Sequence, residues 1–382
     1  MHILIAPNAF KNSLDATAAA EAIREGLNQS KLKCTCECFP VGDGGDGTAT
    51  LLIQKCGGTI VPAEVHDPLG RKIRAAFGLI DNGETAVIEM ADASGLRLLR
   101  CDEFDPLHAT TFGTGELIKC ALDKGVNKII IGIGGSATVD GATGILQALG
   151  IRFLDAGGKI LSNLPEELAD LESIDLSGLD QRISRCALIV LCDVENSLLG
   201  EQGAAKVFGP QKGATGPVIK KLEATLAKLC DVVFRQTGKD LAAIKHGGAA
   251  GGVAAGLRGF LNATLVKGID HFLEITGFDA SLQKADLVIT GEGSIDEQTM
   301  RGKGPFGVAL RAKEKNIPVI GLAGRVALQS DAPLRQYFVQ LLAIGLASVE
   351  PDKAMQNTAS DLQRTAMELG NRLASKNEYG RS

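Results

Sequence analysis

The sequence predicts an α/β protein in which a doubly wound parallel sheet is interrupted by a second α/β segment with a mixed sheet. Strand, glycine-rich loop and helix alternate over residues 1–62 and again over 284–382. Residues 63–283 differ, because Asn82-Gly83 is a hairpin signal that indicates antiparallel pairing. A chain of 382 residues also exceeds one ordinary core. We therefore expect a discontinuous domain over 1–62 and 284–382, with 63–283 inserted into it.

The first elements form two strand-loop-helix units. The apolar stretch "HILIAP" predicts a strand over 2–7, and the helix formers that follow predict a helix over 14–27. A second strand is expected over Leu32–Phe39. After an Asp-Gly loop, "TATLLIQKCGG" predicts a helix that stops at Gly57.

The middle of the chain has a different pattern of predicted strands and helices. Residues 63–96 predict two or three strands around the Asn82-Gly83 turn. Residues 105–125 lead into a strand over 127–135 and a short helix, and 186–196 predict another strand that ends in an acidic loop.

The late part returns to the regular alternation. "ADLVITG" predicts a strand over 285–291, followed by a loop over 292–304 and a helix over 305–316 with Pro305 in its first turn. Two further strands are expected over 317–324 and 338–345. The closing residues 354–376 predict one long helix.

Composition excludes several classes of protein. Apolar residues make up 45% and charged residues 22%, which is typical of a globular protein. The net charge is −5, tryptophan is absent and no basic cluster occurs, so nucleic acid is not an expected partner. No signal peptide or bilayer-length apolar segment is present, which predicts a cytoplasmic protein without membrane contact. Of nine cysteines, Cys34, Cys36 and Cys38 alternate along a strand and suit small buried apolar roles rather than metal binding.

Glycine-rich loops follow several predicted strands. Four carry Asp, Ser, Lys or Arg, namely "PNAFKNS", "VGDGGDGT", "GIGGSATVDGATG" and "GEGSIDEQTMRGKG", and "CDVEN" with Asp193 is a fifth, poorer in glycine. Ligands of open parallel sheets bind at the carboxyl ends of the strands. We therefore expect these loops to face a shared ligand site.

The loop "IGIGGSATVDG" allows two interpretations. Gly132, Gly134 and Ala137 fit a variant dinucleotide fingerprint with Asp155 as the ribose-binding acid, which would indicate a nicotinamide-dependent oxidoreductase on a small hydroxy acid. The favoured interpretation is phosphate binding by main-chain amides, with the Ser136 and Thr138 hydroxyls as further donors and the positive end of the following helix nearby. No Walker sequence is present.

Phosphoryl transfer needs carboxylates for magnesium, cations or amides for the γ-phosphate, and a proton acceptor. The loops supply all three types of group. The candidate metal-binding or basic carboxylates are Asp43, Asp46, Asp193, Glu292 and Asp296, and the candidate anion binders are Lys11, Lys212, Arg301 and Lys303. A non-catalytic sugar-acid binding protein is the further alternative, and it would need no magnesium carboxylates.

Eight sequence motifs together resemble the type-1 bacterial glycerate kinase family. In order they are "APNAFKNSL", "PVGDGGDGT", "IEMADASGL", "GTGELI", "IGIGGSATVDGATGILQALG", "CDVENSLLGEQGAAKVFGPQKGA", "GGAAGG" and "TGEGSIDEQTMRGKGPFGVA". The resemblance runs from Ile3 to at least Gly324. The resemblance implies ATP- and Mg²⁺-dependent phosphorylation of D-glycerate to 2-phosphoglycerate or 3-phosphoglycerate. It also implies a flavodoxin-like domain with an inserted restriction-endonuclease-like domain, an active site in the cleft between them, and a monomer or homodimer.

The expected site follows from these motifs. We expect Lys11 or Arg301 to bind the carboxylate of glycerate and Asp193 or Asp43 to accept the hydroxyl proton. The expected nucleotide-binding residues are Gly134, Gly135, Ser136, Asp140, Gly291, Gly293, Ser294 and Lys303, and the expected metal ligands are Asp46 and Asp296. Two departures from the family pattern stand out. Asn8 and Ala9 replace an aspartate and a serine, and Asp46 replaces a frequent glutamate.

Overall fold

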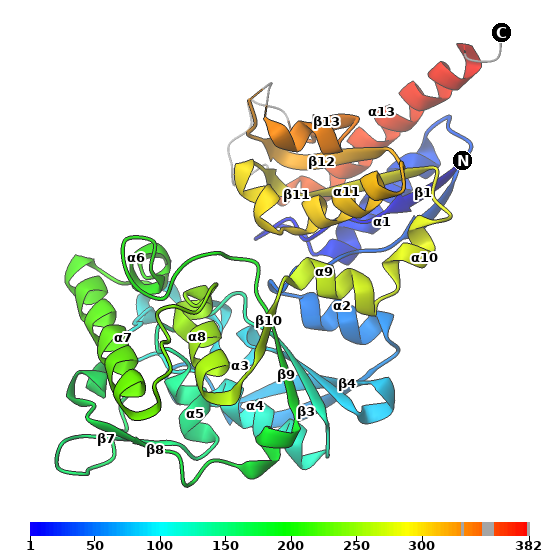
Figure 1. Cartoon of the computed structure of the whole chain (residues 1–382). Helices are drawn as coiled ribbons and strands as arrows, with labels where there is room; N and C mark the ends of the chain where they lie inside the picture. Colours follow the sequence, from blue (N-terminus) through cyan, green and yellow to red (C-terminus); the bar gives the residue numbers. More distant parts are fainter. Residues whose placement is uncertain (330–331, 346–354, 380–382) are drawn as a thin grey trace. The chain divides into compact units, whose positions relative to one another are not determined.

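The computed structural model describes residues 1–329, 332–345 and 355–379, except the side chains of Gln298, Arg301 and 376–379 (Figure 1). The chain divides into two compact units. Unit 1 comprises Met1–Asp43 and Ile269–Ser382, and unit 2 comprises Gly44–Gly268. Each unit has its own main sheet.

Unit 1 contains a five-stranded sheet in the order β13-β12-β11-β1-β2. Its strands are β1 (His2–Ile5), β2 (Thr35–Cys38), β11 (Leu287–Ile295), β12 (Val319–Val326) and β13 (Gln340–Ala343). All neighbouring pairs are parallel. Counted within this sheet the order is 2-1-3-4-5, the order of flavodoxin-like folds. Ile3, Leu4 and Ile5 are fully buried, as expected for a strand covered on both faces.

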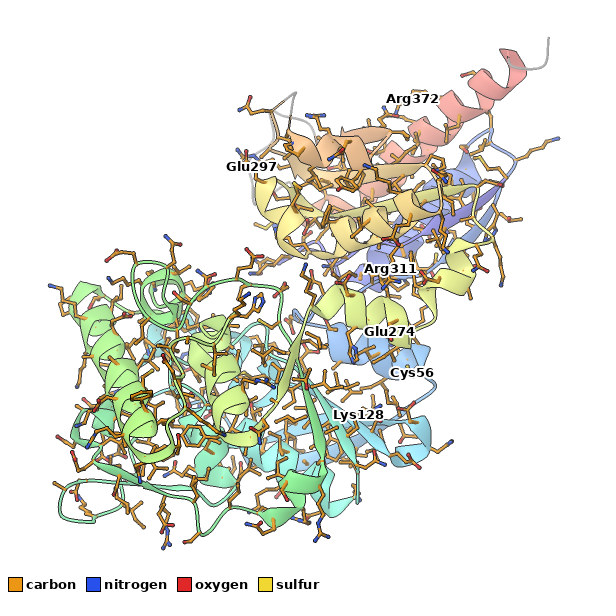
Figure 2. All side chains as sticks on the ribbon, in the orientation of Figure 1. Cys56, Lys128, Glu274, Glu297, Arg311 and Arg372 are labelled. Carbon is orange, nitrogen blue, oxygen red and sulfur yellow. The ribbon has the colours of Figure 1, made fainter. Side chains whose placement is uncertain are left out.

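Helices cover both faces of this sheet. They are α1 (Ala16–Gln29), α9 (Gly268–Ile275), α10 (Phe278–Leu282), α11 (Gly304–Glu314) and α13 (Thr358–Tyr379). α1 and α13 share one core with β1, and Gly26 permits their close approach, since a Cβ there would lie 2.1 Å from the Gln363 carbonyl oxygen. Asp15 caps α1 by accepting from Ala18 N at 2.8 Å. Arg311 on α11, labelled in Figure 2, donates to Asp279 on α10 at 3.1 Å.

Unit 2 contains a mixed six-stranded sheet in the order β10-β9-β6-β5-β4-β3. Its strands are β3 (Thr59–His66), β4 (Lys72–Ile80), β5 (Thr85–Glu89), β6 (Lys128–Gly132), β9 (Ala187–Leu191) and β10 (Thr264–Val266). β5, β6, β9 and β10 run parallel, whereas β4 pairs antiparallel with both β3 and β5. The predicted turn at Asn82-Gly83 joins β4 to β5, and both residues have positive φ.

The remaining elements of unit 2 surround this sheet. The helices are α2 (Thr48–Lys55), α3 (Ala91–Ser94), α4 (Phe112–Asp123), α5 (Thr143–Ala148), α6 (Ala204–Phe208), α7 (Gly216–Thr237) and α8 (Ala249–Leu261). A small antiparallel sheet joins β7 (Arg152–Leu154) to β8 (Ser173–Asp175). Short 3₁₀ turns in the two units include η6 (Pro210–Lys212) and η7 (Glu297–Arg301). Within the described ranges, none of the helices has the length and apolar character needed to span a membrane.

The predicted α/β class, with one parallel and one mixed sheet, is confirmed. The compact units divide at Asp43–Gly44 and Gly268–Ile269, whereas the predicted domain boundaries lie at 62–63 and 283–284. α2 packs against β4 and β5 of unit 2, which accounts for the earlier first division. The assignment of the predicted domains to a flavodoxin-like and a restriction-endonuclease-like fold stays a prediction.

One predicted loop was wrong. Residues 292–295 continue strand β11, with Glu292 opposite Ala323 and Ser294 opposite Arg325 on β12. The alternation of glycine with polar residues carries no strand signal of its own, so pairing with β12 decides this conformation. The predicted start of the last helix at 354 lies outside the described residues, and α13 itself begins at Thr358.

Candidate active site

The carboxyl edge of the sheet in unit 1 gathers a polar cluster from separate parts of the chain. The chain just beyond β1 runs beside the second half of β11, since Asn8 N donates to the carbonyl oxygen of Gly291 at 2.9 Å. β2 ends nearby, and Val41 N donates to Pro7 O at 3.0 Å. We call Asn8, Asp43, Glu292, Asp296 and Lys303 the acid-lysine cluster. It lies where ligands of parallel sheets bind.

Asp43 is a buried carboxylate held by two donors of unit 1. Its Oδ2 accepts from Asn8 Nδ2 at 2.6 Å and from Gly304 N at 3.2 Å, and the residue is 8% exposed. Asn8 Oδ1 in turn accepts from Ala9 N at 2.8 Å. Asn8 is therefore an orienting amide for Asp43, where an aspartate would have placed a second negative charge against it.

Glu292 lies in the second half of β11 and is 7% exposed. Thr299 Oγ1 donates to its Oε1 at 3.0 Å. Burial raises the pKa of Glu292 to about 7; Lys303 opposes this rise, while Asp43 and Asp296 add to it. A carboxyl group with a pKa near neutrality can exchange protons at working pH.

Lys303 lies between two carboxylates without a close bond to either. Its Nζ is 3.9 Å from Glu292 Oε2 and 4.0 Å from Asp296 Oδ1. Ser294 Oγ donates to Asp296 Oδ2 at 3.4 Å. At these separations Lys303 Nζ can donate to an added anion while it still offsets the charge of both carboxylates.

The two candidate carboxylate binders differ in what the structure shows. Lys11 is exposed, and its backbone passes Gly293, where a Cβ would lie 3.5 Å from Lys11 N. Its side chain therefore starts beside the end of β11. Arg301 ends η7, but its side chain lies outside the described set.

In unit 2 a second polar cluster forms around the loop Gly134–Thr138 after β6. Gly134 packs against the loop "VGDGGDGT", since Gly134 N donates to Gly44 O at 3.1 Å and a Cβ on Gly134 would lie 2.6 Å from Gly45 Cα. Leu96 N donates to Gly135 O at 2.9 Å, and Ala137 N to Ser94 O at the same distance. Three predicted motifs thus meet at the carboxyl edge of β5 and β6, where Glu89 lies opposite Gly132.

Lys212 reaches this loop from η6. Its Nζ donates to Ser136 Oγ at 2.8 Å and to Thr138 O at 2.7 Å. The side chain is 2% exposed, and burial lowers its pKa to about 7, while Asp140 counteracts this. Gly213 follows with positive φ and lies close to Phe104, since a Cβ on Gly213 would be 2.5 Å from Phe104 O.

Asp140, a predicted nucleotide-binding residue, is fully buried. Its Oδ2 accepts from Thr111 N at 2.9 Å, Thr111 Oγ1 at 2.7 Å and Gly144 N at 3.2 Å, and its Oδ1 from Ala142 N at 3.1 Å. Burial still raises its pKa above the ordinary range, although these donors act against the rise. The contacts favour a structural role, and they use the first amides of α5 that we expected to face a phosphate.

Asp46, a predicted metal ligand, is paired with Arg97. Arg97 Nη1 donates to Asp46 Oδ1 at 2.7 Å, and the same guanidinium binds Asp92. Glu89 lies behind this pair, with Oε1 accepting from Gly47 N at 2.5 Å and Oε2 from Ala49 N at 3.2 Å. Burial, and next a hydrogen bond with Asp46, raise the pKa of Glu89 to about 8. Glu89 thereby holds the start of α2.

Asp193 lies two residues beyond β9, whose last residue, Leu191, is opposite Gly132. It therefore follows the strand next to the one that carries the glycine loop. The remaining predicted residues, Gly291 and Ser294, lie on β11; a Cβ at Gly291 would be 2.0 Å from Leu322 O, so glycine is needed there for strand packing.

The residues present suit magnesium by donor chemistry. Asp43, Glu292 and Asp296 supply oxygen ligands at one edge, and Mg²⁺ uses one or two carboxylates together with water and phosphate. Within the part of the chain that the structure describes, no group of three or more His, Cys, Asp or Glu could hold a metal on its own. Asp46 and Asp296 belong to different units.

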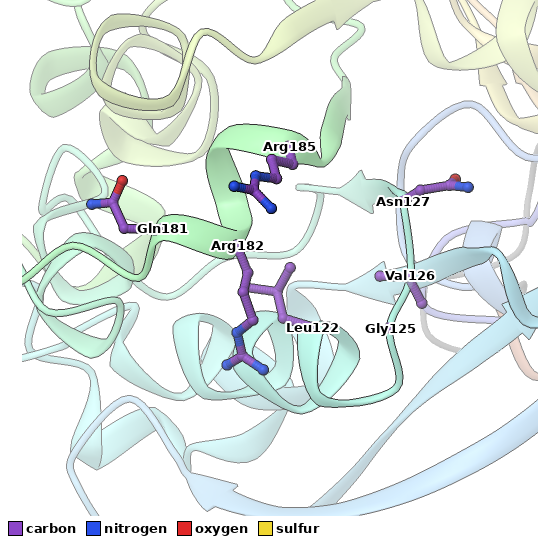
Figure 3. Close-up of a pocket in the computed structure, with 7 residues that line it drawn as sticks. All are labelled: Leu122, Gly125, Val126, Asn127, Gln181, Arg182 and Arg185. Atoms are coloured by element: carbon purple, nitrogen blue, oxygen red, sulfur yellow. The ribbon is translucent and has the colours of Figure 1, made fainter.

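A pocket of about 390 Å³ lies at the opposite edge of the sheet in unit 2 (Figure 3). Its lining includes Asn127, just before β6, and Arg185, just before β9. Arg182 also lines it and is engaged by Asp123 and Asp180, each at 2.7 Å. Because it lies at the amino ends of the parallel strands, it is not part of the candidate site.

Comparison with known proteins decides the family. The family model for the glycerate kinase family matches residues 3–374. Glycerate kinase of Bacillus subtilis (strain 168) is 45% identical over 369 residues, 97% of each chain. Glycerate 2-kinase of Escherichia coli (strain K12) is 41% identical over 98% of each chain. A crystal structure assigned as glycerate kinase 2 from Salmonella typhimurium LT2 superposes with a TM-score of 0.83, 42% identity and 99% coverage of both chains.

The chain belongs to the glycerate kinase family. The predicted family resemblance is thereby confirmed, and the protein is a phosphotransferase. Membership of a kinase family implies use of ATP.

Membership of the glycerate kinase family disagrees with the two alternative interpretations, a nicotinamide-dependent oxidoreductase and a non-catalytic binding protein. The proposed ribose-binding Asp155 also has the wrong context, because β7 belongs to the small sheet with β8 and does not continue the sheet that contains β6. Asp155 Oδ1 accepts from Gly157 N and Lys159 N at 2.9 Å in an exposed turn.

Sequence reasoning located most of the acid-lysine cluster but missed its partners. It did not predict the bond from Asn8 to Asp43, the bond from Thr299 to Glu292, or the part that Glu89 plays beside Asp46. The acid at the end of the apolar stretch "TAVIE" was the available signal for Glu89, since a buried glutamate needs donors nearby.

Proposed function

We propose that this chain transfers the γ-phosphoryl group of ATP to the 2-hydroxyl of D-glycerate, giving 2-phosphoglycerate and ADP. The observation that carries the proposal is the family match over residues 3–374. The choice of the 2-hydroxyl is supported by the relative named glycerate 2-kinase, which is 41% identical over 98% of each chain.

The acid-lysine cluster supplies groups for the acceptor. Lys11 is exposed beside β11 and suits the carboxylate of glycerate, with Arg301 as the alternative. Asp43 is fixed by Asn8 and Gly304 and is our candidate to accept the hydroxyl proton, with Asp193 as the second candidate. Full turnover in Asp193→Asn would remove Asp193 from consideration.

The phosphates need donors and cations. We assign them to the loop from Gly134 to Ser136 and to the segment from Gly291 to Lys303, because Lys303 Nζ lies about 4 Å from either neighbouring carboxylate and suits an added anion. Asp296 and Asp46 are the proposed Mg²⁺ ligands. Mg²⁺ held by these residues would help to offset the negative charge of the phosphates. A reaction in a cleft between the two predicted domains, closed to water, is part of this proposal.

Phosphorus NMR tests both the donor and the position of transfer. The protein is incubated with ATP, Mg²⁺ and D-glycerate, and the ³¹P signal of the product is recorded with proton coupling. Phosphate on the 2-oxygen couples to one proton and gives a doublet, whereas phosphate on the 3-oxygen couples to two and gives a triplet.

The expected result is a doublet that grows in step with ADP. A triplet would contradict the assigned position. No ADP beyond that in a sample without glycerate would contradict ATP-dependent transfer to glycerate. L-Glycerate, tested in parallel, shows whether the site distinguishes the stereoisomers.

A further inference from the structure

Lys212 is buried within unit 2, yet its ammonium group faces the glycine loop. It is 2% exposed and reaches Ser136 Oγ and Thr138 O from η6. Both acceptors belong to the loop after β6, 76 and 74 residues earlier in the chain. Because Nζ already serves two acceptors and the side chain is enclosed, Lys212 is poorly suited to the exposed anion-binding role expected from sequence.

The polarity of these bonds determines what Ser136 can offer. In its protonated form the Lys212 ammonium group only donates, so Ser136 Oγ accepts from it. The hydroxyl proton of Ser136 must then point away from Nζ. Ser136 is thereby left as a donor, which is the polarity that a phosphate oxygen requires.

A second observation concerns the hydroxyl group of Thr138 in the same loop. Thr138 is fully buried, and among the residues that the structure describes its Oγ1 has no hydrogen-bond partner. Buried hydroxyls normally bond to protein, water or ligand. The main chain around Thr138 is held tightly, since a Cβ on Gly251 would lie 2.1 Å from Thr138 O and Gly141 N donates to Gly251 O at 3.0 Å.

We propose that Lys212 is a positioning residue for the nucleotide: it fixes the loop at Thr138 O and orients the Ser136 hydroxyl as a donor to a phosphate oxygen. The proposal rests on the proposed function in one respect, that the ligand is the phosphate chain of ATP. It assigns the contact with phosphate to Ser136 and an indirect role to Lys212.

A double-mutant cycle on the full chain tests this assignment. Lys212→Met keeps the length of the side chain and removes its donors, and Ser136→Ala removes the hydroxyl. Affinities for ATP and for inorganic tripolyphosphate are measured by calorimetry for both variants and their combination, together with KM and kcat. We expect each single variant to weaken both ligands about ten-fold or more, because a hydrogen bond to a charged group is lost. The double variant should be little weaker than either single one, and KM for D-glycerate should stay unchanged.

Two matched variants separate positioning from general damage. Lys206→Met makes the same substitution on α6, where Lys206 pairs with Glu201 near the surface, and should leave ATP affinity unchanged. Ser136→Thr retains a hydroxyl and should restore most of the affinity lost in Ser136→Ala.

The outcomes distinguish this proposal from the proposed function. Wild-type affinity in Ser136→Ala overturns the positioning role, whether or not Lys212→Met folds. Losses that add in the double variant overturn it as well, because Lys212 would then act independently of Ser136. If the unaltered protein fails to phosphorylate D-glycerate from ATP, the proposed function falls, whereas the cycle with tripolyphosphate still decides whether Lys212 acts through Ser136.

Discussion

Glu292 is a carboxyl group that the fold keeps from water while two other carboxylates lie close by. Ionising it in this setting costs free energy, and the lysine beside it is too far away for a close ion pair. The fold retains this unfavourable group in β11, within the site that we propose for phosphoryl transfer. Stability and function therefore place opposite demands on one residue.

This opposition predicts a pH-dependent effect of Glu292→Gln. The pKa of Glu292 is about 7 in the folded protein against an ordinary value of 4.5, so the folded state holds the proton more tightly. The wild type should lose this stabilisation as pH rises from 4.5 through 7. The free energy of unfolding of Glu292→Gln relative to wild type should thus rise by on the order of 3 kcal/mol between pH 4.5 and pH 8.

Urea unfolding in metal-free buffer at several pH values measures this difference. Glu297→Gln, on the exposed turn that follows (Figure 2), is the matched control and should show no such trend. A difference between Glu292→Gln and wild type that is constant with pH would refute the assignment of the pKa.

Among the elements, the glycine loops of unit 2 gave the most information about the site, whereas the ends of the strands could be predicted least well from the sequence. Alternating strands, helices and the Asn82-Gly83 hairpin followed from local patterns, because each depends on residues that are neighbours in sequence. The extension of β11 to Ile295 did not, since it depends on pairing with β12. Nor did the occupation of the first α5 amides by Asp140, because hydrogen bonds from Thr111, 29 residues away in the chain, also hold this carboxylate.

Close packing of two glycine loops predicts that Gly134→Ala is costly. The new Cβ would lie 2.6 Å from Gly45 Cα and 3.0 Å from Gly44 O, and neither backbone atom can move cheaply. We expect a loss of about 1–3 kcal/mol in the free energy of unfolding, together with weaker ATP binding. Gly216→Ala at the start of α7, where a Cβ meets nothing within 4 Å, should leave both unchanged. Denaturant titration and calorimetry of the two variants give the comparison, and equal values for both would contradict this role of Gly134.

At the scale of the whole molecule, the candidate site depends on contacts between residues far apart in the chain. Sequence analysis named Ser136, Lys212, Asp43 and Glu292 as candidates because their residue types suit phosphoryl transfer. It could not show that Lys212 serves Ser136 or that Asn8 orients Asp43, since these pairs are 76 and 35 residues apart. The type of chemistry was therefore predictable from the motifs, whereas the contacts by which one residue orients another were not.

The proposed use of magnesium leads to a prediction about order of binding. No described group of three or more ligating side chains could hold a metal unaided, so Mg²⁺ should require the phosphates of the nucleotide as additional ligands. Calorimetry should give a dissociation constant for Mg²⁺ that is millimolar or weaker in the ligand-free protein. Binding of Mg²⁺ should be much tighter once a non-hydrolysable ATP analogue is present. EDTA should abolish turnover without changing the circular dichroism spectrum. Micromolar binding of Mg²⁺ by the ligand-free protein would contradict the prediction.

The sheet of unit 1 also has a consequence for the synthesis of the protein. β1 lies between β2, which the ribosome makes soon afterwards, and β11, which it makes only after all of 44–268. During translation the edge of β1 that pairs with β11 therefore stays unpaired while residues 44–268 are made. These residues contain every strand of the main sheet of unit 2. We therefore expect the nascent chain to acquire its second unit before its first, with the early β1–β2 pair exposed to unwanted association in the interval.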